Sequence, residues 1–308
     1  MKKILSALLA AVFLITLTGC QGYREIDSEY LISAVGFEHK DSKYKVFAEV
    51  LAISSDKKDT ESKLFYSTGE TPYEAVSNIA AMLPKKAVFD HCSTAIIGTG
   101  IKGGKLKKVI KYLYDTKNLN LGICLYTADD VKKVLSCDNK TLSAGYDIMA
   151  IKSNNEKTTG ISFKNKYYEI CGMQMTAGGF SLPDIELKAD RPAIVKQTVF
   201  FDFSPVCVLT KDEALIFNLL RGGSKGGEIN ISGKKCRVNG IKSNFKAERD
   251  TLYVNLKCNY RQHGDELNNQ LKTETEKVIN KLKNTAALNL LSTDIKKPSG
   301  KIKVKVYD

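Results

Sequence analysis

The chain lacks tryptophan and is poor in histidine and proline. It has no tryptophan, three histidines and six prolines in 308 residues. The histidines, His39, His91 and His263, are widely separated in the sequence, which argues against a zinc site built from imidazole ligands. The scarcity of proline, with 43% hydrophobic residues, favours a folded body over a disordered stalk.

Paired cysteine motifs are also missing. No CxxC occurs, and an odd number of seven cysteines follows Cys20. Most of the seven lie inside apolar runs such as "GICLY" and "PVCVL". This pattern is typical of buried free thiols that pack as small hydrophobic residues. It does not indicate the disulfide framework of a small exported domain.

Acidic residues are fewer than basic ones, and arginine is scarce. The 47 basic and 34 acidic residues give a formal net charge of +13. Only six of the basic residues are arginine, whereas proteins that read nucleic acid favour the arginine fork. The spread of lysines indicates a solvated face held near anionic lipid, and not a nucleic-acid interface.

Long hydrophobic runs are absent after the first residues. Lys2 and Lys3 precede an apolar run over 4–16, which is shorter than the roughly 20 residues of a spanning helix and fits an export signal. "LTGC", residues 17–20, matches the bacterial lipobox, in which the cysteine is diacylated and becomes the new N-terminus. We therefore predict a lipoprotein signal peptide over 1–19, diacylglyceryl and N-acyl lipidation of Cys20, and a lipidated tether over 20–28. The alternative is an ordinary secreted protein with a cysteine near its cleavage site.

The first part of the folded body predicts a hairpin and then a capped helix. Two β-rich runs within 30–53 flank a polar turn at 39–43. In "STGETPYEAVSNIAAMLPKK", Thr71 is placed as an N-cap with Pro72 at the first helical position, and Glu74 is placed to close a capping box. The helix ends before Pro84, and its expected inward stripe is Ala75, Ile79 and Met82.

Short strands and helices then alternate. Residues 87–98 and 119–127 are predicted as strands, with a helix over 105–116 between them. The buried side of that helix is expected to contain Leu106, Val109, Ile110 and Leu113. A further helix is expected to begin at the cap Thr127. Residues 153–166 are polar and predicted to be irregular, and residues 180–192 are predicted to be a linker because Pro183 and Pro192 bracket charged residues.

The last third of the chain has further strand and helix signals. Strands over 193–203 and 205–210 are followed by a helix with a capping box at Thr210 and Glu213, and then by an antiparallel pair within 234–261. A long helix over about 265–291 precedes a final edge strand. We expect an α+β fold of several mixed or antiparallel sheets packed with helices, multi-lobed, with 29–185 as the N-terminal region (possibly two lobes) and 186–308 as the C-terminal domain. A doubly wound sheet is not favoured.

No motif clearly predicts enzyme chemistry. Gly98, Gly100 and Gly103 satisfy GxGxxG, with Asp129 after the next strand, but export separates the chain from the dinucleotide pool. Asp90, His91 and Cys92 are adjacent, and neighbours in a strand point to opposite faces, so a nucleophile–base pair is not expected. His91 is expected to be a hydrogen-bonded structural residue, and the glycine-rich 221–228 a loop. We therefore expect no catalytic, cofactor or metal site.

Three blocks of the chain resemble the Ger(x)C family, the lipoprotein C subunits of spore germinant receptors. They are "GCQGYREIDSEYLISAVGFE", "STGETPYEAVSNIAAMLPKKAVFDHCSTAIIGTG" and "VFFDFSPVCVLTKDEALIFNLLRGG". They occur in the family's order over nearly the whole mature chain. Recurring family positions, which we expect to be structural, are occupied here by Thr71, Glu74, Ala75, His91 and Gly98.

The resemblance implies a subunit that has no known catalytic site and that lies on the outer face of the cell membrane, at the spore inner membrane. It also implies partners, a membrane-spanning A subunit and a multi-pass B subunit to which the nutrient germinant is usually assigned. Two other functions remain open on the sequence. A ligand-binding lipoprotein of a transporter would have two lobes of repeated βα units around a cleft, and an exported enzyme is the third possibility.

Overall fold

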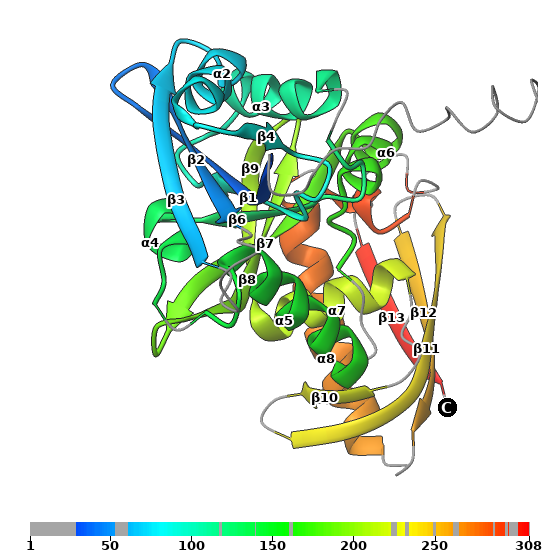
Figure 1. The fold of residues 1–308 in the computed structure, drawn as a ribbon. Coiled ribbons are helices and arrows are strands. Elements are labelled where there is room, and N and C mark those ends of the chain that lie inside the picture. The colour runs from blue at the N-terminus through cyan, green and yellow to red at the C-terminus, as the bar shows by residue number, and fades with distance from the viewer. Residues whose placement is uncertain are drawn as a thin grey trace, which may run out of the picture.

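The computed structural model describes residues 29–52, 61–116, 119–138, 140–159, 163–222, 227–231, 234–248, 251–260, 265–285, 287–292, 295 and 301–307. Within these ranges the strands form a sheet of nine strands and a second sheet of four. Figure 1 shows the larger sheet with its helices in the upper part of the molecule and the smaller sheet, yellow to red, below it. The expected α+β architecture with more than one lobe is confirmed. The predicted signal peptide, Cys20 and the tether lie outside the described residues, as does His263.

The predicted N-terminal hairpin is present. β1 (Glu29–Lys40) pairs antiparallel with β2 (Lys43–Ala52), and β3 (Glu61–Gly69) pairs with β2 as the outer strand. The two turn residues, Asp41 and Ser42, have φ of 50° and 63°. Positive φ at both positions is the geometry that lets a two-residue turn follow the twist of its strands.

The middle of the larger sheet is parallel, which the sequence analysis did not anticipate. β5 (Thr94–Gly98), β6 (Cys124–Ala128) and β7 (Gly179–Lys188) follow β1 as parallel neighbours. β4 (Lys86–Val88) pairs with the first residues of β1. All of β5 and β6 is buried, as expected for parallel strands covered on both faces. The single strand predicted over 87–98 is therefore wrong, because a turn region separates β4 from β5.

Helices cover both faces of this sheet. α2 (Pro72–Met82) and α3 (Gly104–Asp115) pack on one face, and α4 (Val131–Leu135) packs on the other. The four predicted apolar residues of α3 are all buried. In α2 the prediction for Met82 is wrong, because its side chain is 54% exposed. The helix ends there, and the next residue, Leu83, turns inward instead.

The predicted cap of α4 is also wrong. Thr127 lies inside β6 and is buried, because the strand continues to Ala128. The helix is capped by Asp130, whose Oδ1 accepts a hydrogen bond from the backbone N–H of Lys133 at 2.8 Å. The buried parallel strand β6 therefore continues past Thr127, although a threonine there could have capped a helix.

Two helices follow that the sequence analysis missed. α5 (Ala144–Thr159) begins well before the stretch predicted as irregular and runs through its first half, and α6 (Tyr167–Ala177) follows. The polar run 153–159 of α5 has little periodicity, so tertiary packing and not local propensity decides its conformation.

The predicted linker is wrong as well. Residues 180–192 lie in β7 and the start of β8 (Arg191–Phe201), which form an antiparallel hairpin inside the sheet. The turn residues Ala189 and Asp190 have φ of 48° and 57°. β9 (Ser204–Thr210) then closes the sheet as its last strand. The boundary expected between 185 and 186 falls within β7.

The C-terminal part has the predicted helix and antiparallel pair. α7 (Lys211–Gly222) has the predicted capping box: the N–H of Glu213 donates to Thr210 Oγ1 at 3.3 Å, and the N–H of Thr210 donates to Glu213 Oε2 at 2.9 Å. β10 (Gly227–Ile231), β11 (Lys234–Glu248) and β12 (Thr251–Tyr260) are antiparallel neighbours.

The long helix is shorter than predicted, and the final strand is where it was expected. α8 (Asp265–Lys283) ends eight residues before 291, and a separate 3-10 turn, η2 (Leu288–Leu290), follows. Thr285 Oγ1 donates to the carbonyl of Leu282 at 3.0 Å, a local bond that competes with helix continuation. β13 (Lys301–Tyr307) pairs in parallel with β12 at the edge of the smaller sheet.

One apolar core joins the two sheets. The cluster that holds α7, α8 and β12 also contains Val199 of β8 and Leu209 of β9. α7 therefore packs against both the larger and the smaller sheet. The C-terminal part is joined to the rest of the fold by this buried core as well as by the chain itself.

Candidate functional site

The start of α2 contains two exposed members of the recurring family positions, Thr71 and Glu74. Thr71 Oγ1 accepts from the backbone N–H of Glu74 at 3.1 Å, so the predicted cap is present. Glu74 Oε2 accepts from the N–H of Glu70 at 2.8 Å, one residue earlier than a capping box requires. Both side chains are exposed, so the same two residues cap the helix and form part of the surface.

The inner side of α2 lies very close to β3. Ala75 is fully buried, and its carbonyl accepts a hydrogen bond from the hydroxyl of Ser67. A methyl group placed on Gly69 would come within 2.6 Å of the Ala75 nitrogen. The glycine and the small alanine together set this helix-to-strand distance, which explains their residue types.

His91 and its neighbours do not form a catalytic group. His91 is exposed in the turn region between β4 and β5, and its imidazole has no hydrogen-bond partner among the described residues. Cys92 is fully buried, its thiol faces the Thr94 carbonyl at 3.6 Å, and burial raises the pKa of that thiol to about 12. A thiol that stays protonated is a poor nucleophile.

Three backbone amides of the glycine-rich turn after β5 are bonded within the protein, which leaves them unable to bind a phosphate. The N–H groups of Thr99, Ile101 and Gly103 donate to the carbonyls of Ala128, Gly98 and Phe203, respectively. Thr99 Oγ1 also donates to Asp129 Oδ1 at 2.8 Å, so that carboxylate ties the turn to the end of β6.

The close approach of two strands accounts for Gly98 itself. A methyl group there would lie 3.2 Å from the carbonyl oxygen of Phe37, tighter than ordinary contact. Gly98 thus allows β5 to lie against β1.

A buried carboxylate on β2 was missed by the sequence analysis. Glu49 is fully buried, and its oxygens accept from the N–H groups of Ala144 and Gly145 at 2.8 and 3.0 Å and from Ser33 Oγ at 2.9 Å. Lys140 Nζ lies 3.5 Å away. The carboxylate therefore caps the first turn of α5 from across the sheet. A single acid inside the apolar run "FAEVLAI" was the signal.

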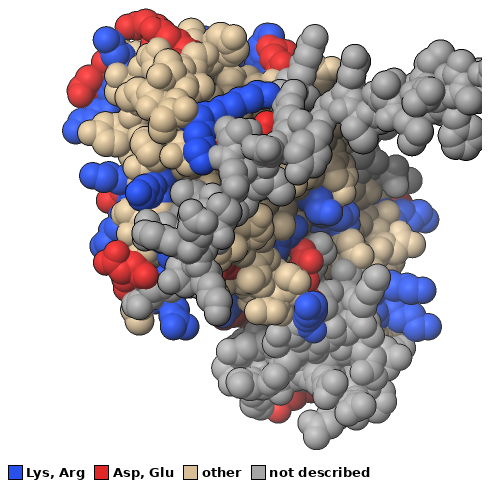
Figure 2. Space-filling model, viewed as in Figure 1, with Lys and Arg blue, Asp and Glu red and all other residues tan. Residues whose placement is uncertain are grey.

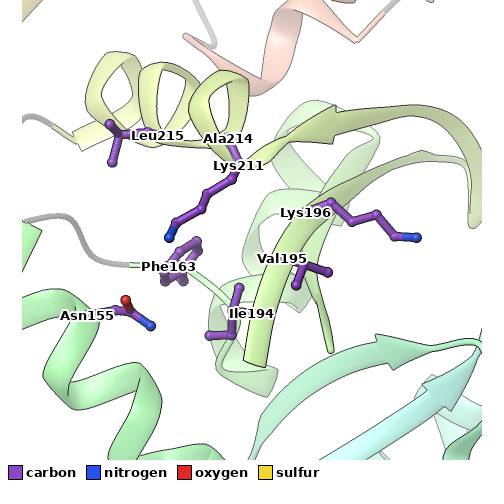
Figure 3. A pocket seen from close by; sticks show the side chains of 8 residues that line it. All are labelled: Asn155, Phe163, Ile194, Val195, Lys196, Lys211, Ala214 and Leu215. Atoms are coloured by element: carbon purple, nitrogen blue, oxygen red, sulfur yellow. The ribbon is translucent and has the colours of Figure 1, made fainter. Parts of the chain in front are cut away.

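An open pocket lies between α5, β8 and α7 (Figure 3). The empty volume of the pocket, including the part open to solvent, is about 430 Å³. Its lining residues are Asn155, Phe163, Ile194, Val195, Lys196, Lys211, Ala214 and Leu215. The Lys211 side chain extends toward Phe163 and Asn155, whereas Lys196 points away. A smaller apolar hollow of about 120 Å³ shares Ile194. The pocket suits an apolar group and contains no acid–base pair.

The described part of the chain gives little support to a metal or a membrane span. Among its His, Cys, Asp and Glu side chains, no three come together as a metal site. None of its helices combines the length and apolar character needed to cross a bilayer. The six cysteines with described side chains are free thiols, as predicted. Figure 2 shows lysine and arginine distributed over the visible face with acidic residues among them.

Comparison with known proteins identifies the family. No curated protein sequence matches the chain. The crystal structure of the GerBC protein is similar with 12% identity and a TM-score of 0.47, over 88% of this chain and 95% of that one. Residues 22–187 match the family model described as the spore germination protein N-terminal domain. The chain belongs to this family of spore germination proteins, as its resemblance to the Ger(x)C family predicted.

Proposed function

We propose that this chain is the non-enzymatic, lipid-anchored C subunit of a spore germinant receptor, needed for nutrient-triggered germination. The observation that carries the proposal is the match of residues 22–187 to the spore germination domain, which begins two residues after the lipobox cysteine Cys20. Its partners would be a membrane-spanning A subunit and a multi-pass B subunit, and the B subunit would bind the germinant.

The proposed location is the outer face of the cell membrane, at the spore inner membrane. Several acyl chains on Cys20 make attachment stable, whereas one chain would bind only marginally. The formal net charge of +13 becomes +11 once Lys2 and Lys3 leave with the proposed signal peptide (13 − 2 = 11), and this positive charge adds attraction to anionic lipid.

The proposal that the chain is not an enzyme is supported by the chemistry of the candidate groups. The Cys92 thiol is buried with a raised pKa, and the amides of Thr99, Ile101 and Gly103 in the glycine turn are already bonded within the protein. The pocket of Figure 3 has amide and ammonium groups at its side and apolar groups elsewhere, which is suited to binding and not to proton transfer.

A pull-down of the tagged chain from spore membranes tests the proposal. We expect A-type and B-type subunits to co-purify, and spores without this chain to lose their response to nutrients. Recovery of a permease or an ATPase in their place would contradict the proposal and favour a transporter's binding lipoprotein.

A further inference from the structure

The chain enters the larger sheet at one particular edge. β1, β5 and β6 are parallel, so their first residues lie toward the same edge, which we call the amino-terminal edge. Glu29, the first residue of β1, pairs there with Lys86 of β4. The segment that connects Cys20 to the folded body therefore arrives at this edge.

Four large apolar side chains are exposed near the amino-terminal edge. They are Met175 (87% exposed), Tyr114 (70%), Leu121 (55%) and Tyr168 (52%). Leu121 lies just before β6, and its carbonyl accepts from the N–H of Tyr168 at 3.4 Å. Tyr114 is in the last turn of α3, from which the chain returns to the start of β6. Such residues are unremarkable singly, but a group of them marks an interaction surface.

α6 lies along this edge. The N–H of its first residue, Tyr167, donates to the carbonyl of Ile123 at 2.8 Å, and its C-cap Gly178 directly precedes β7. The helix thus leads from the start of β6 to the start of β7, as its green ribbon in Figure 1 also indicates.

The helix is apolar on two sides. Its inward residues, Tyr167, Ile170 and Ala177, are buried. Its outward residues include Tyr168 and Met175, seven positions apart and so on one stripe. The sheet covers the inner apolar side of α6. The outer apolar side would be buried only by contact with a second apolar environment.

Basic residues lie beside aromatic rings at this edge. Lys166 Nζ lies 5.8 Å from the centre of the Tyr168 ring, and Lys85 Nζ lies 5.6 Å from that of Tyr30. The nearby acids are engaged: Glu169 accepts from the N–H of Lys166 at 3.0 Å, and Asp115 pairs with Lys111. Tyrosine rings beside lysines are typical of the membrane–water interface.

The short tether limits which part of the body can meet the membrane. Eight residues separate Cys20 from Glu29, which span about 30 Å when fully extended. A body of this length has a radius of gyration of about 19 Å, so its diameter exceeds the tether. The edge where the tether arrives is consequently held close to the lipid.

We propose that the amino-terminal edge rests in the interface of an anionic bilayer through Tyr114, Leu121, Tyr168 and Met175, with Lys85 and Lys166 beside them. This inference rests on the proposed lipid anchor, which brings the edge to the membrane.

The absence of tryptophan provides a direct test. Tyr168→Trp places a single indole in the lipidated full chain, reconstituted into phosphatidylglycerol-containing vesicles with bromine on the acyl chains. The matched control is Tyr73→Trp, because Tyr73 is 71% exposed in the first turn of α2, beyond Gly69, which pairs with Tyr44 at the opposite end of β1 and β2. We expect brominated lipid to quench the indole at position 168 at least about twofold, as for a side chain at the acyl boundary, and to leave the one at 73 unchanged.

Sedimentation with the vesicles is measured on the same samples. Protein that sediments while the indole at 168 stays unquenched, or is quenched no more than the one at 73, would overturn the inference and leave the anchor standing. An unquenched indole at 168 would assign the edge to water or a protein partner. Protein that fails to sediment would remove the anchor and the inference with it. If Tyr168→Trp does not fold, Met175→Trp tests the same stripe.

Discussion

At the scale of single residues, Glu49 joins a strand to a helix 95 residues away. Its carboxylate accepts three hydrogen bonds at 2.8–3.0 Å, all of them buried. Glu49→Ala would leave the two amide groups without an acceptor, whereas the Ser33 hydroxyl keeps the backbone carbonyl of residue 49 at 3.3 Å. At about 1–3 kcal/mol for each buried unsatisfied group, we expect the free energy of unfolding to fall by at least about 2 kcal/mol, measured by urea denaturation.

Glu186→Ala is the matched control for that loss. Glu186 pairs with Lys196 at 3.2 Å, but its side chain is 43% exposed, so the change should cost only about 0–1 kcal/mol. Equal effects of the two substitutions would show that Glu49 does not secure α5.

Asp184 predicts a pH dependence of stability. Its side chain is buried, Thr198 Oγ1 donates to it at 2.8 Å, and burial raises the pKa of the carboxyl from 3.8 to about 6. Between these values the folded state binds more protons than the unfolded state, so the free energy of unfolding falls as pH rises through the window. The contribution is present below about pH 4 and lost above about pH 6, and its size is about 2–3 kcal/mol.

The substitution Asp184→Asn isolates this effect. Asparagine does not titrate, so the stability of the variant relative to the natural chain should rise by about 2–3 kcal/mol from pH 4 to pH 8. Thermal unfolding of both proteins across that range, with Asp41→Asn in the exposed β1–β2 turn as control, measures the difference. A relative stability that is constant with pH would contradict the raised pKa.

At the scale of elements, the α2 cap allows a structural role and a partner-binding role to be separated. Thr71 accepts from the N–H of Glu74 at 3.1 Å, and loss of such a cap costs about 1 kcal/mol, within 0.5–2. We expect Thr71→Ala to lower the melting temperature of the purified protein, with germination of mutant spores reduced only in step with protein level. Unchanged melting with lost germination would instead place α2 at a partner surface.

The elements that the sequence predicted correctly are those with local signals. The caps at Thr71 and Thr210 and the hairpin turn at Asp41 depend on residues within four positions of one another. The β7–β8 hairpin was mistaken for a linker because Pro183 and the charged residues after it outweighed a buried strand, and α5 was missed because its start is capped by Glu49 from β2. A short window of sequence around α5 does not contain Glu49, and one around β7 does not show that this strand is buried.

The candidate site was still less visible from sequence than the fold. The pocket of Figure 3 needs α5, β8 and α7 to meet. The strand and α7 were predicted, but the α5 residue Asn155 lies in the stretch predicted as irregular. The exposed stripe of α6 was invisible for the same reason, since that helix was not predicted.

At the scale of the whole molecule, one apolar core connects the parts. Residues of β8 and β9 pack in the same cluster as α7, α8 and β12, so the larger and smaller sheets move together unless that cluster opens. In the proposed arrangement, the position of the whole body relative to the membrane would be set separately, by the lipid anchor and the amino-terminal edge.

The last prediction concerns that anchor. Cys20→Ala removes the acyl chains, each buried methylene of which contributes about 0.8 kcal/mol of membrane affinity. We expect the variant to be largely released from washed membranes, measured as the fraction of protein in the pellet. The natural chain should stay bound at both low and high salt, whereas any residual binding of the variant should fall with salt, because only lysines and the exposed edge then hold it. Full retention of the variant at high salt would rule out lipid as the main anchor.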